Sequence, residues 1–194
     1  MIFKFFHYPQ RDVDRITPFY GAIVAQGRSP GFYQSYGVPD TVNGRFEMLV
    51  LHAILLLQRL NGASEPLRML GQDIFDMFCS NMDANLRELG VGDLAVPKKM
   101  RMIGEAFYGR QSVYQAALGA TDPGALVAAL TRNVFGAKAP PAGAERLAAY
   151  VWQAARCLAA QDDAALSRGT IPFPDPESVG AEHVNAQGAL DDPG

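Results

Sequence analysis

Apolar side chains recur every three or four residues along each long segment of this chain, and this spacing constrains its fold more than any other feature. The segment over residues 64–89 keeps the spacing throughout, in the apolar residues Leu67, Leu70, Ile74, Met77, Phe78, Met82, Leu86 and Leu89. Such residues fall on one face of a helix. No stretch combines period-two alternation with hairpin turn residues. The sequence therefore predicts an all-α, single-domain bundle of about six to seven helices.

Residues that start and stop helices divide the chain into segments. We expect helices over residues 12–26, 41–60, 64–89, 97–118, 123–134 and 142–166, with a short aromatic segment around residues 32–36. Asp40 or Thr41 is expected to cap the second helix, and Ser64 the third. The helix over residues 41–60 leaves little of its circumference polar, so we expect it to be the central, most buried helix.

A length of 194 residues fits one domain with a continuous core, which we assign to residues 12–168. Residues 1–11 carry several phenylalanines and are expected to form an apolar strap over the core; the alternative is that they dip into a membrane interface. Residues 169–194 hold four prolines and no periodicity, so we expect an extended or mobile tail pinned at its start by Ile171 and Phe173. The longest apolar run, residues 48–57, is too short to span a membrane.

The charge balance disfavours some classes of partner. Seventeen basic against twenty acidic residues give a formal net charge of -3, so neither DNA nor RNA is attracted by the surface as a whole. The two cysteines, Cys79 and Cys157, lie in helix-like patterns and fit buried thiols in a reducing compartment.

The sequence contains no complete catalytic or cofactor-binding motif. Residues 27–31 match the G-x-S-x-G pattern of serine hydrolases, but Pro30 follows the serine and has no N–H for an oxyanion hole. The sequence contains no H-E-x-x-H, Cys-x-x-Cys, G-x-G-x-x-G or Walker pattern. We therefore expect no enzyme, no metal site and no cofactor.

His52 lies in the expected central helix, in line with Arg45 and Arg59 at seven-residue spacing. A histidine on an apolar helix usually finds a local hydrogen-bond acceptor, so we interpret His52 as a satisfied core or edge histidine. Two alternatives stay open, a contact with a partner and a haem or metal ligand.

Residues 82–100, MDANLRELGVGDLAVPKKM, form a helical corner with charges on both sides. Gly90 suits the position just past a helix end, and Pro97 suits the first turn of the next helix. Lysines at a helix start oppose the helix dipole, so either water solvates them or an acidic or phosphate-bearing partner neutralises them. We predict a partner-binding surface around this corner, formed by Arg45, Asp83, Arg87, Asp93, Lys98, Lys99, Arg101, Tyr108 and Arg110.

With these residues in hand, the chain resembles the ubiquinol-cytochrome c chaperone family, the helical assembly factors of the respiratory cytochrome bc1 complex. The similarity extends from about residue 12 to about residue 135. Its most specific part is the corner; the similar segments are YG at 20–21, VPDT at 38–41, GRFE at 44–47, the His52 helix, NLRELGVGD at 85–93, VPKKM at 96–100 and FYGR at 107–110.

The resemblance implies a non-enzymatic chaperone. Mitochondrial members of the family bind newly made cytochrome b and work beside the ribosome with a small partner subunit. The long targeting extension of those members is not seen here, so the resemblance implies a compact bacterial member, cytoplasmic or peripheral on the inner face of the inner membrane. The lysine and arginine cluster at residues 98–101 is the one patch suited to ribosomal RNA.

Two rival functions stay open. One is a helical haem-binding carrier or enzyme, with a pocket built around His52, Tyr20 and Arg45. The other is a generic adaptor for another membrane complex.

Overall fold

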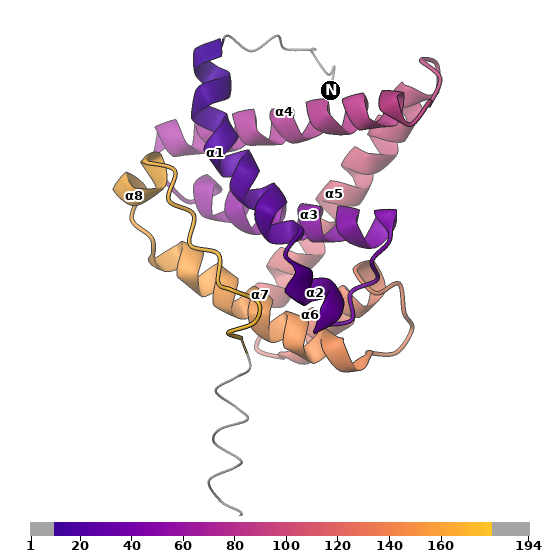
Figure 1. The fold of residues 1–194 in the computed structure, drawn as a ribbon. Coiled ribbons are helices and arrows are strands. Elements are labelled where there is room, and N and C mark those ends of the chain that lie inside the picture. Colours follow the sequence, from indigo (N-terminus) through magenta and orange to yellow (C-terminus); the bar gives the residue numbers. More distant parts are fainter. Residues whose placement is uncertain (1–9, 180–194) are drawn as a thin grey trace, which may run out of the picture.

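The computed structural model describes residues 10–179, and in this part of the chain every regular element is a helix (Figure 1). The elements in chain order are α1 (Gln10–Gly27), α2 (Pro30–Gln34), α3 (Val42–Asn61), α4 (Glu65–Glu88), α5 (Val96–Gly119), α6 (Gly124–Asn133), α7 (Ala142–Ala160) and α8 (Asp163–Ser167). The prediction of an all-α bundle is confirmed.

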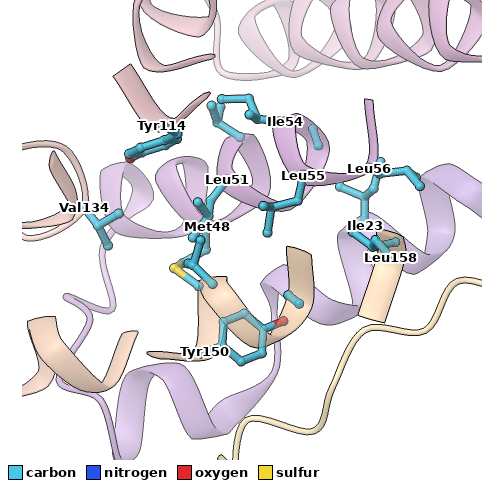
Figure 2. Packing of buried hydrophobic residues seen from close by; sticks show 14 of the residues in the cluster. Ile23, Met48, Leu51, Ile54, Leu55, Leu56, Tyr114, Val134, Tyr150 and Leu158 are labelled. Carbon is cyan, nitrogen blue, oxygen red and sulfur yellow. The ribbon is translucent and has the colours of Figure 1, made fainter. Parts of the chain in front are cut away.

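Helix α3 is the central element, as its apolar sequence predicts. It packs against α1, α4, α5 and α7, and more than half of its residues are buried. In Figure 2, Met48 extends from α3 toward Tyr150 of α7, whereas Ile54 points to the opposite side of the helix. Both α3 side chains are fully buried in one continuous hydrophobic cluster. The other long helices therefore take their positions from contacts with this helix.

Helices α4 and α5 meet at a corner that projects from the rest of the ribbon (Figure 1). Gly90 has a φ of +78°, and the N–H of Val91 donates to the carbonyl of Leu86 at 3.0 Å. A left-handed glycine just past the last turn ends α4, as the sequence predicts. Pro97 lies in the first turn of α5, where its missing N–H costs no hydrogen bond.

The two predicted helix caps have different outcomes. Thr41 caps α3, because its hydroxyl accepts a hydrogen bond from the Gly44 N–H at 3.1 Å. Ser64 occupies the N-cap position of α4, but its hydroxyl makes no capping hydrogen bond. Instead, the Ser64 N–H donates to Asp163 at 2.9 Å. Ser64 therefore has the predicted N-cap position, but the predicted capping by its side chain is wrong.

The prediction of one helix over residues 142–166 is also wrong. Helix α7 ends at Ala160, and α8 begins anew at Asp163. Asp162 caps α8 by accepting from the Ala165 N–H at 2.6 Å. The predicted aromatic segment likewise begins as a short helix, α2.

The start of the tail is pinned to the bundle, as predicted. Residues 170–175 continue from α8 without helical structure, and Ile171 and Phe173 are half-buried against the core. Tyr36 donates to the carbonyl of Pro176 at 2.6 Å. Most of the predicted N-terminal strap and the rest of the tail lie outside the described residues, although Gln10 and Arg11 begin α1.

Candidate functional site

A cluster of ion pairs holds the corner together. Arg87, near the end of α4, binds Asp83 one turn earlier at 2.6 Å and Asp93 in the following loop at 2.5 Å. The side chain of Asp83 is only 15% exposed, whereas that of Asp93 is 88% exposed. Arg87 therefore ties the loop to the helix before it, and these three predicted residues do come together.

The cations on the far side of the corner are unpaired or only loosely paired in the described residues. Lys98 and Lys99 are exposed in the first turn of α5, and their side chains make no hydrogen bond or ion pair within residues 10–179. The Arg101 guanidinium lies 3.8 Å from the Glu105 carboxylate, and both side chains are 70% exposed. Exposed pairs of this kind contribute little to stability. The two lysines are therefore free to meet an outside partner.

Large apolar side chains accompany these charges. Leu89 is 75% exposed and Leu94 is 98% exposed, while Met102 in the second turn of α5 is 57% exposed. The helical spacing of α4 predicts Leu89 on the apolar, inward face, and this prediction is wrong. The helix ends at Glu88, so the helical period no longer sets the direction of the Leu89 side chain.

Tyr108 lies further along α5 and faces α4. Its ring centroid is 5.6 Å from that of Phe75, and half of the residue is exposed. Partial burial raises the pKa of Tyr108, which keeps the phenol neutral. An amphipathic ring of this kind is common in protein interfaces.

Arg110 belongs to the interior of the fold. It donates two hydrogen bonds of 2.5 Å to Glu47 of α3, whose residue is only 1% exposed. Burial raises the pKa of Glu47, although the Arg110 guanidinium opposes that rise. This pair joins α3 to α5, so Arg110 makes its main contact inside the fold and not at the corner.

Arg45 lies at the start of α3 and not at the corner. It pairs with Asp40 at 2.6 Å, and its guanidinium carbon is 5.7 Å from the centre of the Tyr33 ring. The ion pair lowers the pKa of Asp40. Arg45 remains a predicted partner contact, but on a separate part of the surface.

His52 is fully buried, and both ring nitrogens have partners. Nδ1 donates to the Met48 carbonyl at 2.7 Å, which fixes the tautomer, so Nε2 accepts from the Tyr150 hydroxyl at 2.8 Å. Burial lowers the pKa of His52 to about 4. Neither Tyr20 nor Arg45 is among its hydrogen-bond or ring contacts in the described chain. The interpretation as a satisfied core histidine holds.

Residues 10–179 contain no group of three or more His, Cys, Asp or Glu side chains that would hold a metal ion. A cavity of about 410 Å³ opens between the ends of α3 and α7, beside Arg59 and Asp163, and none of the predicted site residues lines it. No helix in this range is both long and apolar enough to cross a membrane.

Comparison with known proteins identifies the family. The family model described as ubiquinol-cytochrome C chaperone matches residues 34–173, which include the whole corner. A crystal structure of the Cbp3 homolog from Brucella abortus is similar to this chain, with 43% identity and a TM-score of 0.80; the match covers 88% of this chain and 94% of that one. The comparison with curated proteins gives no match. Because the family model matches well over half of the residues of this chain, the chain belongs to the ubiquinol-cytochrome c chaperone family.

Proposed function

We propose that this protein is a non-enzymatic assembly chaperone of the respiratory cytochrome bc1 complex and that its client is newly made cytochrome b. Membership of the chaperone family and the similarity to a Cbp3 homolog support this proposal. The closed hydrogen bonding of His52 favours it over a haem carrier, because neither ring nitrogen is open to a metal.

The observation that carries the proposal is the chemistry of the α4–α5 corner. We define the corner surface as Asp83, Arg87, Asp93, Lys98, Lys99, Arg101 and Tyr108. It combines the ion-pair cluster of Arg87 with two lysines that form no ion pair in the described chain and a half-exposed tyrosine ring. Interfaces between proteins favour arginine and tyrosine, and charges at their rim select and orient the partner.

Lys98 and Lys99 give the corner surface its preference for a client. Both carry a positive charge, and neither forms an ion pair with a carboxylate in the described chain. Acidic loops that connect the membrane spans of a client supply the opposite charge. The protein meets such loops from the inner face of the membrane, and we propose that face as its place of action.

The test is direct binding of detergent-solubilised cytochrome b to purified protein. We expect the K98E/K99E variant to bind at least about tenfold more weakly, since reversal turns attraction into repulsion. The K138E/R156E variant is the matched control: it reverses two exposed charges elsewhere and should bind as the original protein does. Equal binding by both folded variants would remove the corner from the proposal.

Haem titration tests the rival function separately. We expect no saturable, His52-dependent change in the haem absorption band. A saturable change that disappears in His52→Ala, while that variant stays folded, would favour the carrier.

A further inference from the structure

Residues 171–177, here called the tail segment, lie on the bundle without regular helical structure. Three of them are prolines, which have no N–H and restrict the backbone. Within the described chain, no backbone–backbone hydrogen bond joins residues 171–179 to a helix. The hydrogen bonds that join the tail segment to the helices come from side chains of the bundle. The bundle therefore holds the tail segment as it would hold a separate peptide.

Two side chains of the bundle bind backbone carbonyls of the tail segment. Gln26, near the end of α1, donates to the carbonyl of Pro174 at 2.7 Å. Tyr36, just after α2, donates to the carbonyl of Pro176 at 2.6 Å. Every residue of any chain carries such a carbonyl. These two contacts therefore fix the path of a bound segment without fixing its sequence.

Ring contacts and close packing favour particular side chains beside these carbonyls. The Phe173 ring meets the buried His52 ring edge to face, with the centroids 5.1 Å apart. Pro176 is buried next to Gly31 of α2. A Cβ atom at Gly31 would lie 3.2 Å from Cγ of Pro176 and would clash with the Glu177 carboxylate. The bundle therefore accommodates an aromatic residue that is followed three residues later by a proline.

A cation lies at the acidic end of the tail segment. Ser35 donates to the Glu177 carboxylate at 3.1 Å, and the guanidinium carbon of Arg146 is 4.3 Å from the centre of the Tyr36 ring. Arg146 and both carboxylates of the tail segment act electrostatically on the Tyr36 hydroxyl, so these charges share one region. Opposite charges at the edge of a contact favour the matching partner. Acidic residues after the prolines therefore suit this region.

The tail segment covers side chains that need a replacement partner when it leaves. Tyr36 is 1% exposed and His52 is 0% exposed. Departure of the tail segment would take the acceptor from the Tyr36 hydroxyl and the Phe173 ring from the His52 ring. Both losses cost free energy. A segment of the same chemistry removes that cost, because it restores the carbonyl and the ring.

We propose that this region binds a segment of another protein with the pattern aromatic–Pro–acidic–Pro–acidic, and that the tail segment occupies it until that partner displaces the tail. The pattern is that of the sequence FPDPE at residues 173–177. The region, here called the tail site, consists of Gln26, Gly31, Ser35, Tyr36, His52 and Arg146. Docking of proline-rich segments on aromatic side chains is a recurring mode of peptide recognition. The tail site shares no residue with the corner surface and does not depend on the client proposed above.

The covalent link favours the tail segment over a free peptide. A segment on the same chain has an effective concentration on the order of millimolar. The original protein should therefore bind a free copy of the tail segment weakly. Weakening the contacts of the tail segment should open the site to that copy.

The experiment measures binding of a fluorescently labelled peptide, TIPFPDPESV, to the full-length protein by anisotropy. The peptide copies residues 170–179. We expect the F173A/E177A protein, here called the opened variant, to bind it at least about tenfold more tightly than the original protein does. A peptide of the same composition in scrambled order is the control ligand and should bind neither protein. Thermal unfolding checks the fold, and the two single variants replace the opened variant if it does not fold.

Further substitutions in the opened variant locate the bound peptide. Tyr36→Phe removes the hydroxyl that binds the Pro176 carbonyl, and it should weaken peptide binding severalfold, as expected for the loss of one hydrogen bond. Tyr33→Phe is the matched control. The Tyr33 hydroxyl donates to the carbonyl of Gly27 and not to the tail segment, so peptide binding should not change.

Each outcome decides the question. Peptide binding by the folded opened variant that is no tighter than binding by the original protein would overturn the proposal. Equal binding of the scrambled peptide, or equal effects of Tyr36→Phe and Tyr33→Phe, would also overturn it, because the peptide would then bind without the tail site. Concentration-dependent dimers of the original protein that dissociate when the peptide is added would assign the site to the tail segment of a second copy and exclude a foreign partner.

Discussion

At the scale of single residues, a network of hydrogen bonds links side chains in the centre of the bundle. Gln26 donates to the Tyr150 hydroxyl at 2.9 Å and to the carbonyl of Pro174 at 2.7 Å, and Tyr150 in turn donates to His52. This network joins α1, α3, α7 and the start of the tail. A buried polar group that loses its hydrogen-bond partner destabilises the fold. Removal of one member of the network therefore leaves its neighbours unpaired and lowers the stability of the protein.

The buried imidazole makes stability depend on pH. The pKa of His52 is about 4 in the folded protein and about 6.5 when unfolded, so the unfolded chain takes up its proton first as the pH falls. As the pH falls from 7 to 5, the free energy of unfolding should therefore fall by about 2 kcal/mol because of His52. Urea unfolding at both pH values measures the loss. The same loss in His52→Gln would contradict this assignment.

The buried pair of Glu47 and Arg110 should respond unequally to removal of either partner. In Arg110→Ala, the Glu47 carboxylate stays buried without its counter-ion, and we expect a loss of about 3–5 kcal/mol. In Glu47→Gln, the Arg110 side chain is 20% exposed and can reach water, so the loss should be smaller. Urea unfolding of the two variants at pH 7 compares these losses.

Lowering the pH distinguishes this mechanism from simple loss of packing. The raised pKa of Glu47 rises further without Arg110, so the folded form of Arg110→Ala binds a proton before the unfolded chain does. Its stability relative to the original protein should therefore partly recover as the pH falls from 7 to 5. A deficit that does not change with pH would point to packing alone.

At the scale of elements, a salt bridge explains where the last long helix breaks. Arg59 at the end of α3 donates to the carbonyls of Leu158 and Gln161 and binds Asp163 at 2.8 Å. Asp163 also accepts from the Ser64 N–H, and the hydrogen bond from Arg59 is the main cause that lowers its pKa to about 2. These contacts hold the end of α7, the start of α8 and the start of α4 around a single guanidinium.

The α4–α5 corner depends on one left-handed glycine. Gly90 has a φ of +78° and no neighbouring atom close enough to obstruct a side chain, so Gly90→Ala should cost only the backbone strain, about 1–2 kcal/mol. Gly92, two residues later, has no such φ, and Gly92→Ala should change stability little. Unfolding in urea measures both variants. Equal effects would show that the turn does not depend on the conformation of Gly90.

At the scale of the whole molecule, the sequence predicts the features that local patterns encode. The helical period locates the long helices, and the run at residues 82–100 locates the corner and its glycine turn. Thr41 is a correct cap because capping is a contact over three residues. The family resemblance carried by the corner residues is confirmed by the match to the family model.

Contacts between distant residues set the features that the sequence does not predict. Asp163 is 99 residues from Ser64, and Arg110 is 63 residues from Glu47. The sequence does contain one signal for the pair of Glu47 and Arg110. Glu47 is an acidic residue inside an otherwise apolar helix, and such a residue needs a counter-ion when it is buried. No local pattern marks the break between α7 and α8 as strongly, since it depends on Arg59.

The central claim is that this family member assembles the cytochrome bc1 complex by holding its newly made cytochrome b. The most direct measurement is purification of the tagged protein from its native membranes in mild detergent, followed by identification of the subunits that co-purify. The account predicts cytochrome b without the mature partners of the complex, and less of it with K98E/K99E. Recovery of another membrane complex in place of cytochrome b would contradict the account.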